Sequence, residues 1–362
     1  MSPRTALVIG ATGITGSNAA RHLAESGWEV VGVSRSEPRG LPGVRHVPVD
    51  VLDPAAVEKA LLDVGATHLF FCTWSRQETE AKNIEVNGAM LRNVLEAAGR
   101  AGSLQHAALV TGLKHYLGPF EAYAQKPAKP PFRESQGRLD HENFYYEQED
   151  ILFAAADRYG FTWSVHRPHT VIGYALGNAM NMGVTLAVYG TLAREMGIPF
   201  VFPGSPEQLA GTTDITDARI LARHLAWAAT DERAANEAFN IVNGDTFHWS
   251  DMWEVVASGL GVEPAPYPGK PTPLVEQMAD ARERWAQIAD RENLRERDVD
   301  RLAPWWHTDS DLGRTVETYA DMSKSRDAGF TDEQDSRRSF LDLFERLRTE
   351  RVIPQQSGGA AT

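Results

Sequence analysis

Short apolar runs alternate with amphipathic stretches along the first half of the chain. Runs rich in β-branched and other apolar residues stand at 6–9, 29–33, 46–49, 68–72, 107–110 and 162–165. Segments with the apolar spacing of a helix lie between them, at 17–26, 54–64, 78–101 and 142–159. Because strands that are buried on both faces have continuous apolar sequences, this alternation predicts βαβ units and a parallel sheet covered by helices.

The second half of the chain is less regular. Residues 180–196 form a long apolar segment, 217–230 has the pattern of an amphipathic helix, and 238–242 predicts a late strand. Residues 249–351 are mostly helical and polar in pattern, and the end of the chain is rich in Gly, Ala, Ser and Gln. We therefore expect a sheet domain at 1–175 to which 212–245 returns, a smaller, mostly helical substrate lobe at 176–211 and 246–353, and a disordered tail at 354–362.

A glycine-rich turn follows the first expected strand and precedes the first expected helix. Its sequence is Gly10-Ala-Thr12-Gly13-Ile14-Thr15-Gly16. Glycines at this spacing permit a tight turn, close approach of the backbone to a pyrophosphate, and close packing of the helix on the strand. The phosphate then lies at the helix N-terminus, where backbone N–H groups point at it. This context predicts a doubly wound parallel sheet of the Rossmann type, with a dinucleotide bound at Gly10, Thr12, Gly13, Ile14, Thr15 and Gly16.

The ends of the next strands indicate which dinucleotide binds. An NAD site usually has Asp or Glu after the second strand, whereas this chain has Ser34-Arg35-Ser36. Arg35 can bind a 2′-phosphate and the serines can donate hydrogen bonds to it, so NADPH/NADP+ is expected; a solvated surface Arg is the alternative. Beyond the later strands, Asp50 and Val51 are expected at the adenine and Thr73 along the cofactor.

Composition excludes several classes of function. The 362 residues have a net charge of −13, which disfavours nucleic acid as a partner. Cys72 is the single cysteine, so the chain builds neither an internal disulfide nor a zinc cluster, and no metal is expected. We find no apolar stretch of about 20 residues and no signal pattern, and therefore expect no membrane partner and a cytoplasmic location.

The positions of the seven lysines show whether the chain contains the usual catalytic pair. A glycine-rich start with a long C-terminal lobe suggests an extended short-chain dehydrogenase/reductase, in which Tyr-x-x-x-Lys stands on one helix. None of the lysines has Tyr four positions earlier. Lys114 is the best candidate for a lysine supplied from elsewhere, because it follows a strand at the edge where open α/β sheets bind ligands. Tyr145 and Tyr146 follow on a helix, and only one of them can face a cofactor because they point about 100° apart.

Two motifs resemble those of the progesterone 5β-reductase and iridoid synthase family, an atypical branch of the extended short-chain dehydrogenases. They are Thr-Gly-Leu-Lys-His-Tyr-Leu-Gly-Pro-Phe at 111–120 and Asn-Phe-Tyr-Tyr-Glu-Gln-Glu-Asp at 143–150, and the similarity extends over nearly the whole chain. The family usually has Gln where Val110 stands, and Arg-Pro-Gly-Asn-Ile where this chain has Arg-Pro-His-Thr-Val at 167–171. The resemblance implies that Lys114 and Tyr145 are the catalytic pair. It also implies a cofactor site that includes Tyr145, Val110, Val171, Asn178, Ala179 and Met180, and a substrate pocket walled by Trp74, Leu117, Phe120 and Met180.

These features predict an NADPH-dependent reductase of activated C=C bonds that acts on a small enone or enal by 1,4-hydride addition. Carbonyl reduction or sugar-nucleotide epimerisation, as in ordinary extended relatives, is one alternative. A non-catalytic NADP(H) sensor is another. The natural substrate, the stereochemistry and the formation of a homodimer are left open by the sequence, and so is the choice between Tyr145 and Tyr146 as the residue that faces the nicotinamide.

Overall fold

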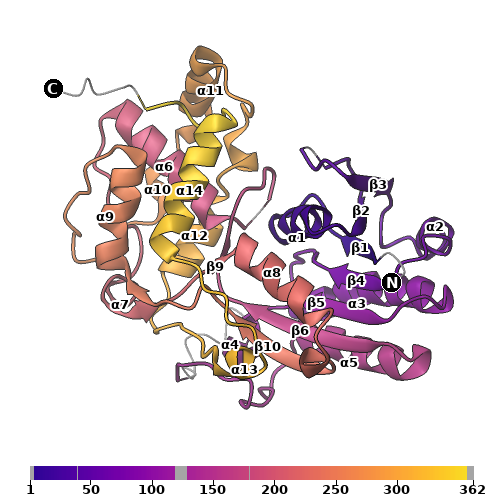
Figure 1. Cartoon of the computed structure of the whole chain (residues 1–362). Coiled ribbons are helices and arrows are strands. Elements are labelled where there is room, and N and C mark those ends of the chain that lie inside the picture. Colours follow the sequence, from indigo (N-terminus) through magenta and orange to yellow (C-terminus); the bar gives the residue numbers. More distant parts are fainter. Residues whose placement is uncertain (1–3, 39, 119–128, 179, 357–362) are drawn as a thin grey trace. The chain divides into compact units, whose positions relative to one another are not determined.

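The computed structural model describes residues 4–38, 40–118, 129–178 and 180–356. The chain divides into two compact units (Figure 1). The first consists of Met1–His169, Ala218–Val242 and Ala320–Asp332, and the second of Thr170–Asp217, Asn243–Tyr319 and Glu333–Thr362. The boundaries differ by about six residues from those expected at 175 and 212. The return of Ala320–Asp332 to the first unit has no counterpart in the sequence prediction.

A parallel sheet forms the centre of the first unit. In the described part of the chain it has seven strands in the order β10-β6-β5-β4-β1-β2-β3. The strand order reverses next to β1, which is the Rossmann arrangement predicted from the sequence, and ligands bind such sheets at this reversal. The strands are β1 (Thr5–Ile9), β2 (Glu29–Ser34), β3 (Val44–Pro48), β4 (His68–Phe71), β5 (His106–Val110), β6 (Thr162–Pro168) and β10 (Glu237–Ile241).

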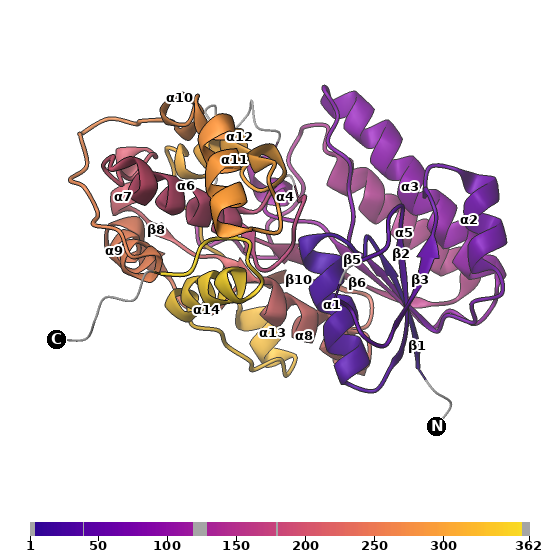
Figure 2. The same cartoon turned by 90° about the horizontal axis from the view of Figure 1, so that it is seen from above.

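Helices cover both faces of this sheet (Figure 2). On one face α2, α3 and α5 pack together over the apolar side chains of the central strands, and on the other α1 packs against α8. Side-chain oxygens of Asp53, Thr79 and Asn143 accept hydrogen bonds from the first turns of α2, α3 and α5 and so define where these helices begin. The helices are α1 (Ile14–Glu25), α2 (Pro54–Leu61), α3 (Glu80–Arg100), α4 (Lys114–Leu117), α5 (Phe144–Tyr159), α8 (Ala218–Ala228) and α13 (Ser323–Asp327), with a 3-10 turn η2 (Glu232–Ala234).

The second unit has its own apolar core, formed mainly by α6, α9 and α14. The long apolar segment of the sequence is α6, which is buried on all sides from Met182 to Ala193. No helix in the described residues is both long and apolar enough to cross a membrane. The elements are β7 (Val171–Ile172), α6 (Met182–Met196), α7 (Pro206–Ala210), β8 (Thr212–Thr213), β9 (Thr216–Asp217), β11 (Phe247–His248), α9 (Trp249–Leu260), α10 (Leu274–Gln277), α11 (Ala281–Glu292), η3 (Val299–Arg301), α12 (Trp305–Leu312) and α14 (Ser336–Thr349).

A line of hydrogen-bonded polar side chains crosses the interior of the first unit from β5 through β6 to α8 and α13. Its links measure between 2.8 and 3.1 Å. Burial lowers the pKa of His106 and of His224 to about 3, and holds that of His166 well below its usual range. All three imidazoles are therefore neutral near pH 7. We call this line the histidine chain; its members are Thr162, His106, Ser164, His166, His224 and Ser325.

Candidate functional site

The residues predicted to bind the cofactor lie in the first unit where the parallel strands end. Gly10 follows β1, Arg35 follows β2, Asp50 comes shortly after β3, Thr73 comes shortly after β4, and Lys114 comes shortly after β5. Because all of these strands are parallel, their carboxyl ends meet at one edge of the sheet. The structure thus brings the sequence candidates of the first unit to the edge at which open α/β sheets bind ligands.

The glycine-rich turn has the close contacts that a dinucleotide loop requires. A Cβ added to Gly10 would lie 2.7 Å from the Cβ of Thr73, and the φ angle of Gly10 is +86°. A Cβ added to Gly16 would lie 2.2 Å from the carbonyl oxygen of Gly10. Gly13 is the N-cap of α1 and supplies no side-chain hydrogen bond there. This backbone arrangement fits a pyrophosphate bound by the N–H groups of the turn and of the first residues of α1, Ile14, Thr15 and Gly16.

The residues predicted to bind the cofactor after the second and third strands differ in their exposure to solvent. Arg35 and Ser36 are exposed, which fits a guanidinium that binds a 2′-phosphate. The hydroxyl of Ser34 donates to the carbonyl of Ser36 at 2.7 Å and also contacts His46. Asp50 is exposed and accepts a hydrogen bond from the backbone of Leu52. Val51 is buried and lies in the apolar core on one face of the sheet.

Lys114 is held by a carboxylate that the sequence analysis did not identify. Its Nζ pairs with Oε2 of Glu80, the first residue of α3. The other carboxylate oxygen of Glu80 accepts a hydrogen bond of 2.7 Å from the backbone N–H of Phe144, the first residue of α5. The ring of Phe144 lies 4.7 Å from the Lys114 ammonium and stacks on the ring of Trp74 at 5.3 Å. The ammonium therefore lies between a carboxylate and an aromatic face.

The two tyrosines of α5 have different surroundings. The hydroxyl of Tyr146 donates to the carbonyl oxygen of His115 at 2.6 Å and accepts from the N–H of Leu139 at 3.0 Å. Burial raises the pKa of Tyr146. The hydroxyl of Tyr145 instead lies beside the loop after β5, where a Cβ added to Gly112 would be 3.2 Å from it. Tyr146 is thus a buried structural tyrosine, whereas the Tyr145 hydroxyl is directed to the segment that carries Lys114.

Asn143 joins the Lys114 segment to the helix of Tyr145. Its side-chain carbonyl accepts a hydrogen bond from the N–H of Tyr145 at 3.1 Å, and its amide donates to the carbonyl oxygen of Lys114 at 2.9 Å. The side chain is buried. Asn143 therefore fixes the backbone positions of the candidate lysine and the candidate tyrosine relative to one another.

The carboxylate of Glu149, on α5, is the centre of an ion-pair network. The carboxylate of Glu149 lies 3.1 Å from Arg167, 3.1 Å from Arg138 and 3.5 Å from His115. Burial alone would raise the pKa of Glu149, but the nearby His115 imidazole and the positive charge of Arg167 outweigh it and lower that pKa. Burial also lowers the pKa of His115. The network thus connects α5 to α4 through His115 and to β6 through Arg167.

The remaining candidates fall into three groups. Val171, Asn178 and Met180 belong to the second unit, where the side chain of Asn178 accepts a hydrogen bond from the N–H of Met180 at 3.0 Å. Val110 ends β5 and is half-buried, and Leu117 packs in a small apolar cluster with Leu113, Tyr116 and Phe132. Phe120 and Ala179 lie outside the described residues.

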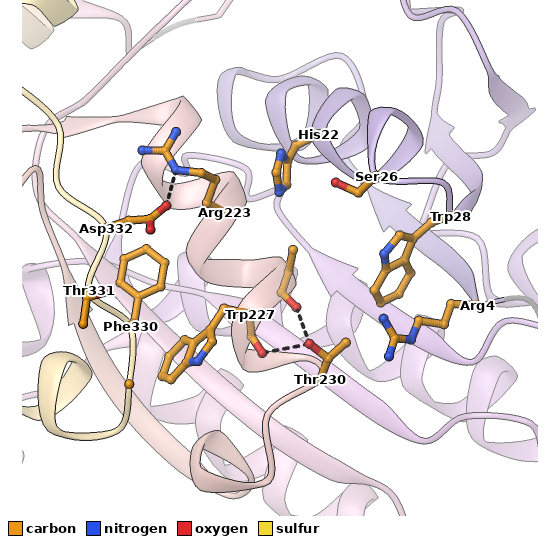
Figure 3. A pocket seen from close by; sticks show the side chains of 12 residues that line it. Arg4, His22, Ser26, Trp28, Arg223, Trp227, Thr230, Phe330, Thr331 and Asp332 are labelled. Carbon is orange, nitrogen blue, oxygen red and sulfur yellow. Dashed lines mark hydrogen bonds and ion pairs between the residues drawn. The ribbon is translucent and has the colours of Figure 1, made fainter. Parts of the chain in front are cut away.

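A hollow of about 440 Å³ lies elsewhere on the first unit (Figure 3). It is bordered by Arg4 and Trp28, which immediately precede β1 and β2, and by Arg223 and Trp227 of α8. It therefore lies at the amino ends of the strands, the edge opposite Lys114 and the glycine-rich turn. No predicted site residue lines it. In the described part of the chain, no group of three His, Cys, Asp or Glu residues could hold a metal ion.

Solved structures show the class of fold. The chain is similar to a UDP-glucose 4-epimerase of Thermotoga maritima, with a TM-score of 0.70 and 15% identity over 95% of this chain and 99% of that chain. It is also similar to an epimerase of Methanothermobacter thermautotrophicus, with a TM-score of 0.69 and 17% identity over 96% and 93% of the two chains. The protein thus has a Rossmann fold, as the sequence predicted.

Sequence comparison then defines the family. The model of the PRISE-like Rossmann-fold domain matches residues 54–354. The (S)-8-oxocitronellyl enol synthase ISY1 of Nepeta racemosa is 39% identical over 96% of this chain and 93% of its own length. A 3-oxo-Delta(4,5)-steroid 5-beta-reductase of Arabidopsis thaliana is 38% identical over the same shares. The chain belongs to the PRISE-like family, which confirms the resemblance found in the two motifs.

Proposed function

We propose that the protein is an NADPH-dependent reductase of C=C bonds conjugated with a carbonyl group. The observation that carries this proposal is the arrangement of Lys114 and Tyr145. They come from different segments, and Asn143 bonds to the backbone of both. In an ordinary extended relative, one helix carries both residues of Tyr-x-x-x-Lys. In this chain two separate segments supply the phenol and the ammonium, and Asn143 joins them.

The residues of the chain would act on the carbonyl end of the substrate. NADPH, when bound, supplies a hydride to the β-carbon of the enone. Negative charge then develops on the carbonyl oxygen, and hydrogen-bond donors already in position lower the barrier most. The Tyr145 hydroxyl donates to this oxygen, and the Lys114 ammonium strengthens that hydrogen bond and holds the nicotinamide ribose. Protonation at the α-carbon completes the reduction.

The relatives support this class of substrate. A 3-oxo-Δ4,5 steroid, named in one of the two relatives, contains a C=C bond conjugated with a carbonyl. The exposed Arg35 and the glycine-rich turn support NADPH/NADP+ as the cofactor. Val171, Asn178 and Met180 are assigned to the nicotinamide end, and Trp74, Leu117 and Met180 to the substrate pocket, on the resemblance alone.

Mixing the protein with NADPH and a panel of enones, cyclohexenone and a 3-oxo-Δ4 steroid among them, tests the proposal. We expect the reduced-nicotinamide absorbance to fall and the product to be the saturated ketone, with NADPH preferred over NADH. An alcohol product would indicate carbonyl reduction instead. Tight NADPH binding without turnover on any enone or enal would indicate a non-catalytic sensor.

The remaining parts of the proposal concern the setting of the enzyme. We place it in the cytoplasm, with neither nucleic acid nor a membrane as partner; the acidic composition disfavours nucleic acid. Subcellular fractionation tests the location. Sedimentation equilibrium distinguishes a homodimer from a monomer.

A further inference from the structure

Glu80 contacts the two segments that carry the candidate catalytic pair. It is the first residue of α3 and stands 34 residues before Lys114. Its Oε2 pairs with the Lys114 ammonium, and its Oε1 accepts a hydrogen bond from the N–H of Phe144, next to Tyr145. One carboxylate therefore contacts the lysine with one oxygen and the start of the tyrosine's helix with the other.

The surroundings of this ion pair make it stronger than an ordinary surface pair. The side chains of Lys114 and Glu80 are 11% and 18% exposed. Solvent screens such a pair much less than an exposed one. The Phe144 ring, 4.7 Å from the ammonium, limits its position on another side.

A second ion pair on the same helix provides a contrast. Lys82 and Glu85 are 2.7 Å apart, and their side chains are 50% and 68% exposed. Exposed pairs at this spacing contribute a few tenths of a kcal/mol at most. The difference in burial separates a carboxylate that fixes a functional lysine from one that merely accompanies a surface lysine.

We propose that Glu80 is a positioning residue that holds the Lys114 ammonium at a fixed place beside Tyr145. This inference rests on the proposed function for the roles of Lys114 and Tyr145. Glu80 itself touches neither substrate nor cofactor in this assignment and acts through the lysine. Glu80 also accepts a hydrogen bond from the N–H of Phe144. This bond holds the start of α5, and hence Tyr145, at a fixed distance from that ammonium.

A double-mutant cycle tests the proposal with the full-length enzyme. Glu80→Gln retains an oxygen that can accept from Phe144 but removes the negative charge. Lys114→Met removes the ammonium, and the double variant completes the cycle. We expect Glu80→Gln to lower kcat about tenfold in the wild-type background and by less than twofold when Lys114 is already Met, because residues acting through one another are not additive.

Glu85→Gln is the matched control, and we expect it to leave kcat unchanged. Thermal unfolding of every variant separates loss of fold from loss of rate. A tenfold loss from Glu80→Gln in both backgrounds would show that Glu80 acts on the fold of α5 and not through Lys114, and an unchanged kcat in the wild-type background would equally overturn the proposal. If Lys114→Met alone leaves turnover intact, the failure lies in the proposed catalytic pair, a result distinct from failure of Glu80.

Discussion

Two groups of polar side chains among the described residues of the first unit differ in charge and in their partners. The group around Lys114 is charged, with an ammonium, the carboxylate of Glu80 and a tyrosine hydroxyl at the carboxyl edge of the sheet. The histidine chain is neutral and lies inside the sheet and beneath α8. Each of its internal links joins two protein side chains over less than 3.2 Å.

Under the proposed function, the two groups of polar side chains serve two different purposes. In the histidine chain the hydrogen bonds are made between protein groups, so the cost of burying polar atoms is offset within the fold. Around Lys114 the groups are brought to the edge of the sheet, where a ligand can complete their interactions. Polarity and burial alone therefore do not distinguish a candidate functional site from a structural cluster. What distinguishes the Lys114 group is its position at the carboxyl ends of the strands.

Acid should destabilise the fold through the histidine chain. In the histidine chain, burial disfavours the charged imidazole. The folded-state pKa values of His106 and His224 lie at about 3, and that of His166 lies well below its usual range. The unfolded chain binds these protons near pH 6.5, so stability is lost as the pH falls below that value. Each histidine contributes up to about 1.4 kcal/mol per pH unit, so the three together contribute up to about 4 kcal/mol per pH unit.

Urea denaturation between pH 7 and pH 5.5 measures this effect, because ordinary carboxylates remain ionised in that range. Replacing His224 by Gln should reduce the slope of the unfolding free energy against pH by up to about 1.4 kcal/mol per pH unit. The exposed His141 is the control, and His141→Gln should leave the slope unchanged. A free energy of unfolding that does not change over this pH range would contradict the account of the histidine chain.

Substitutions of the two adjacent tyrosines of α5 should have different effects, one on the rate and the other on stability. Tyr145→Phe should lower kcat roughly 10²-fold, because it removes a hydrogen-bond donor to the developing enolate. Tyr146→Phe should leave kcat within about threefold and lower the free energy of unfolding by about 1–2 kcal/mol, because His115 and Leu139 lose their partner. Steady-state kinetics and urea denaturation of both variants make the measurement, and the opposite pattern would move the role to Tyr146.

A smaller effect is expected from crowding the Tyr145 hydroxyl. A methyl group at Gly112 would lie 3.2 Å from this hydroxyl and 3.4 Å from the carbonyl oxygen of Pro168, so the phenol must shift by a few tenths of an ångström. Because small misplacements at a reacting centre reduce rate, Gly112→Ala should lower kcat roughly fivefold. Gly137→Ala, where a Cβ would meet nothing within 4 Å, is the matched control. Equal rates for the two variants would show that the position of the Tyr145 hydroxyl is not critical.

The sequence predicted the order of elements in the first unit because its strands are continuous apolar runs and its helices have the apolar spacing of amphipathic segments. The boundaries were less accurate. The first helix begins at Ile14 and not at 17, because helical backbone starts within the glycine-rich turn. β6 runs on to Pro168, beyond the expected end at 165, because it pairs with both β5 and β10.

The candidate site was predictable only in part. Lys114 stood out because lysines are few and because of its position after a strand, and the resemblance favoured Tyr145 over Tyr146. Glu80 was missed because a contact between residues 34 positions apart leaves no periodic signal. The available hint was a carboxylate in the first turn of the helix that follows β4. The histidine chain was missed for a similar reason, since its links join β5, β6, α8 and α13.

The double role of Asn143 has a consequence for how such an enzyme can diversify. Its side-chain amide donates to the backbone carbonyl of Lys114, and its side-chain oxygen accepts from the backbone N–H of Tyr145. These bonds hold together the two ends of the stretch of chain between Lys114 and Tyr145. Insertions, deletions and exchanges of sequence between these ends need not alter the spacing of the lysine and the tyrosine. Under the proposed function, this stretch can change without moving the backbone of the proposed catalytic pair.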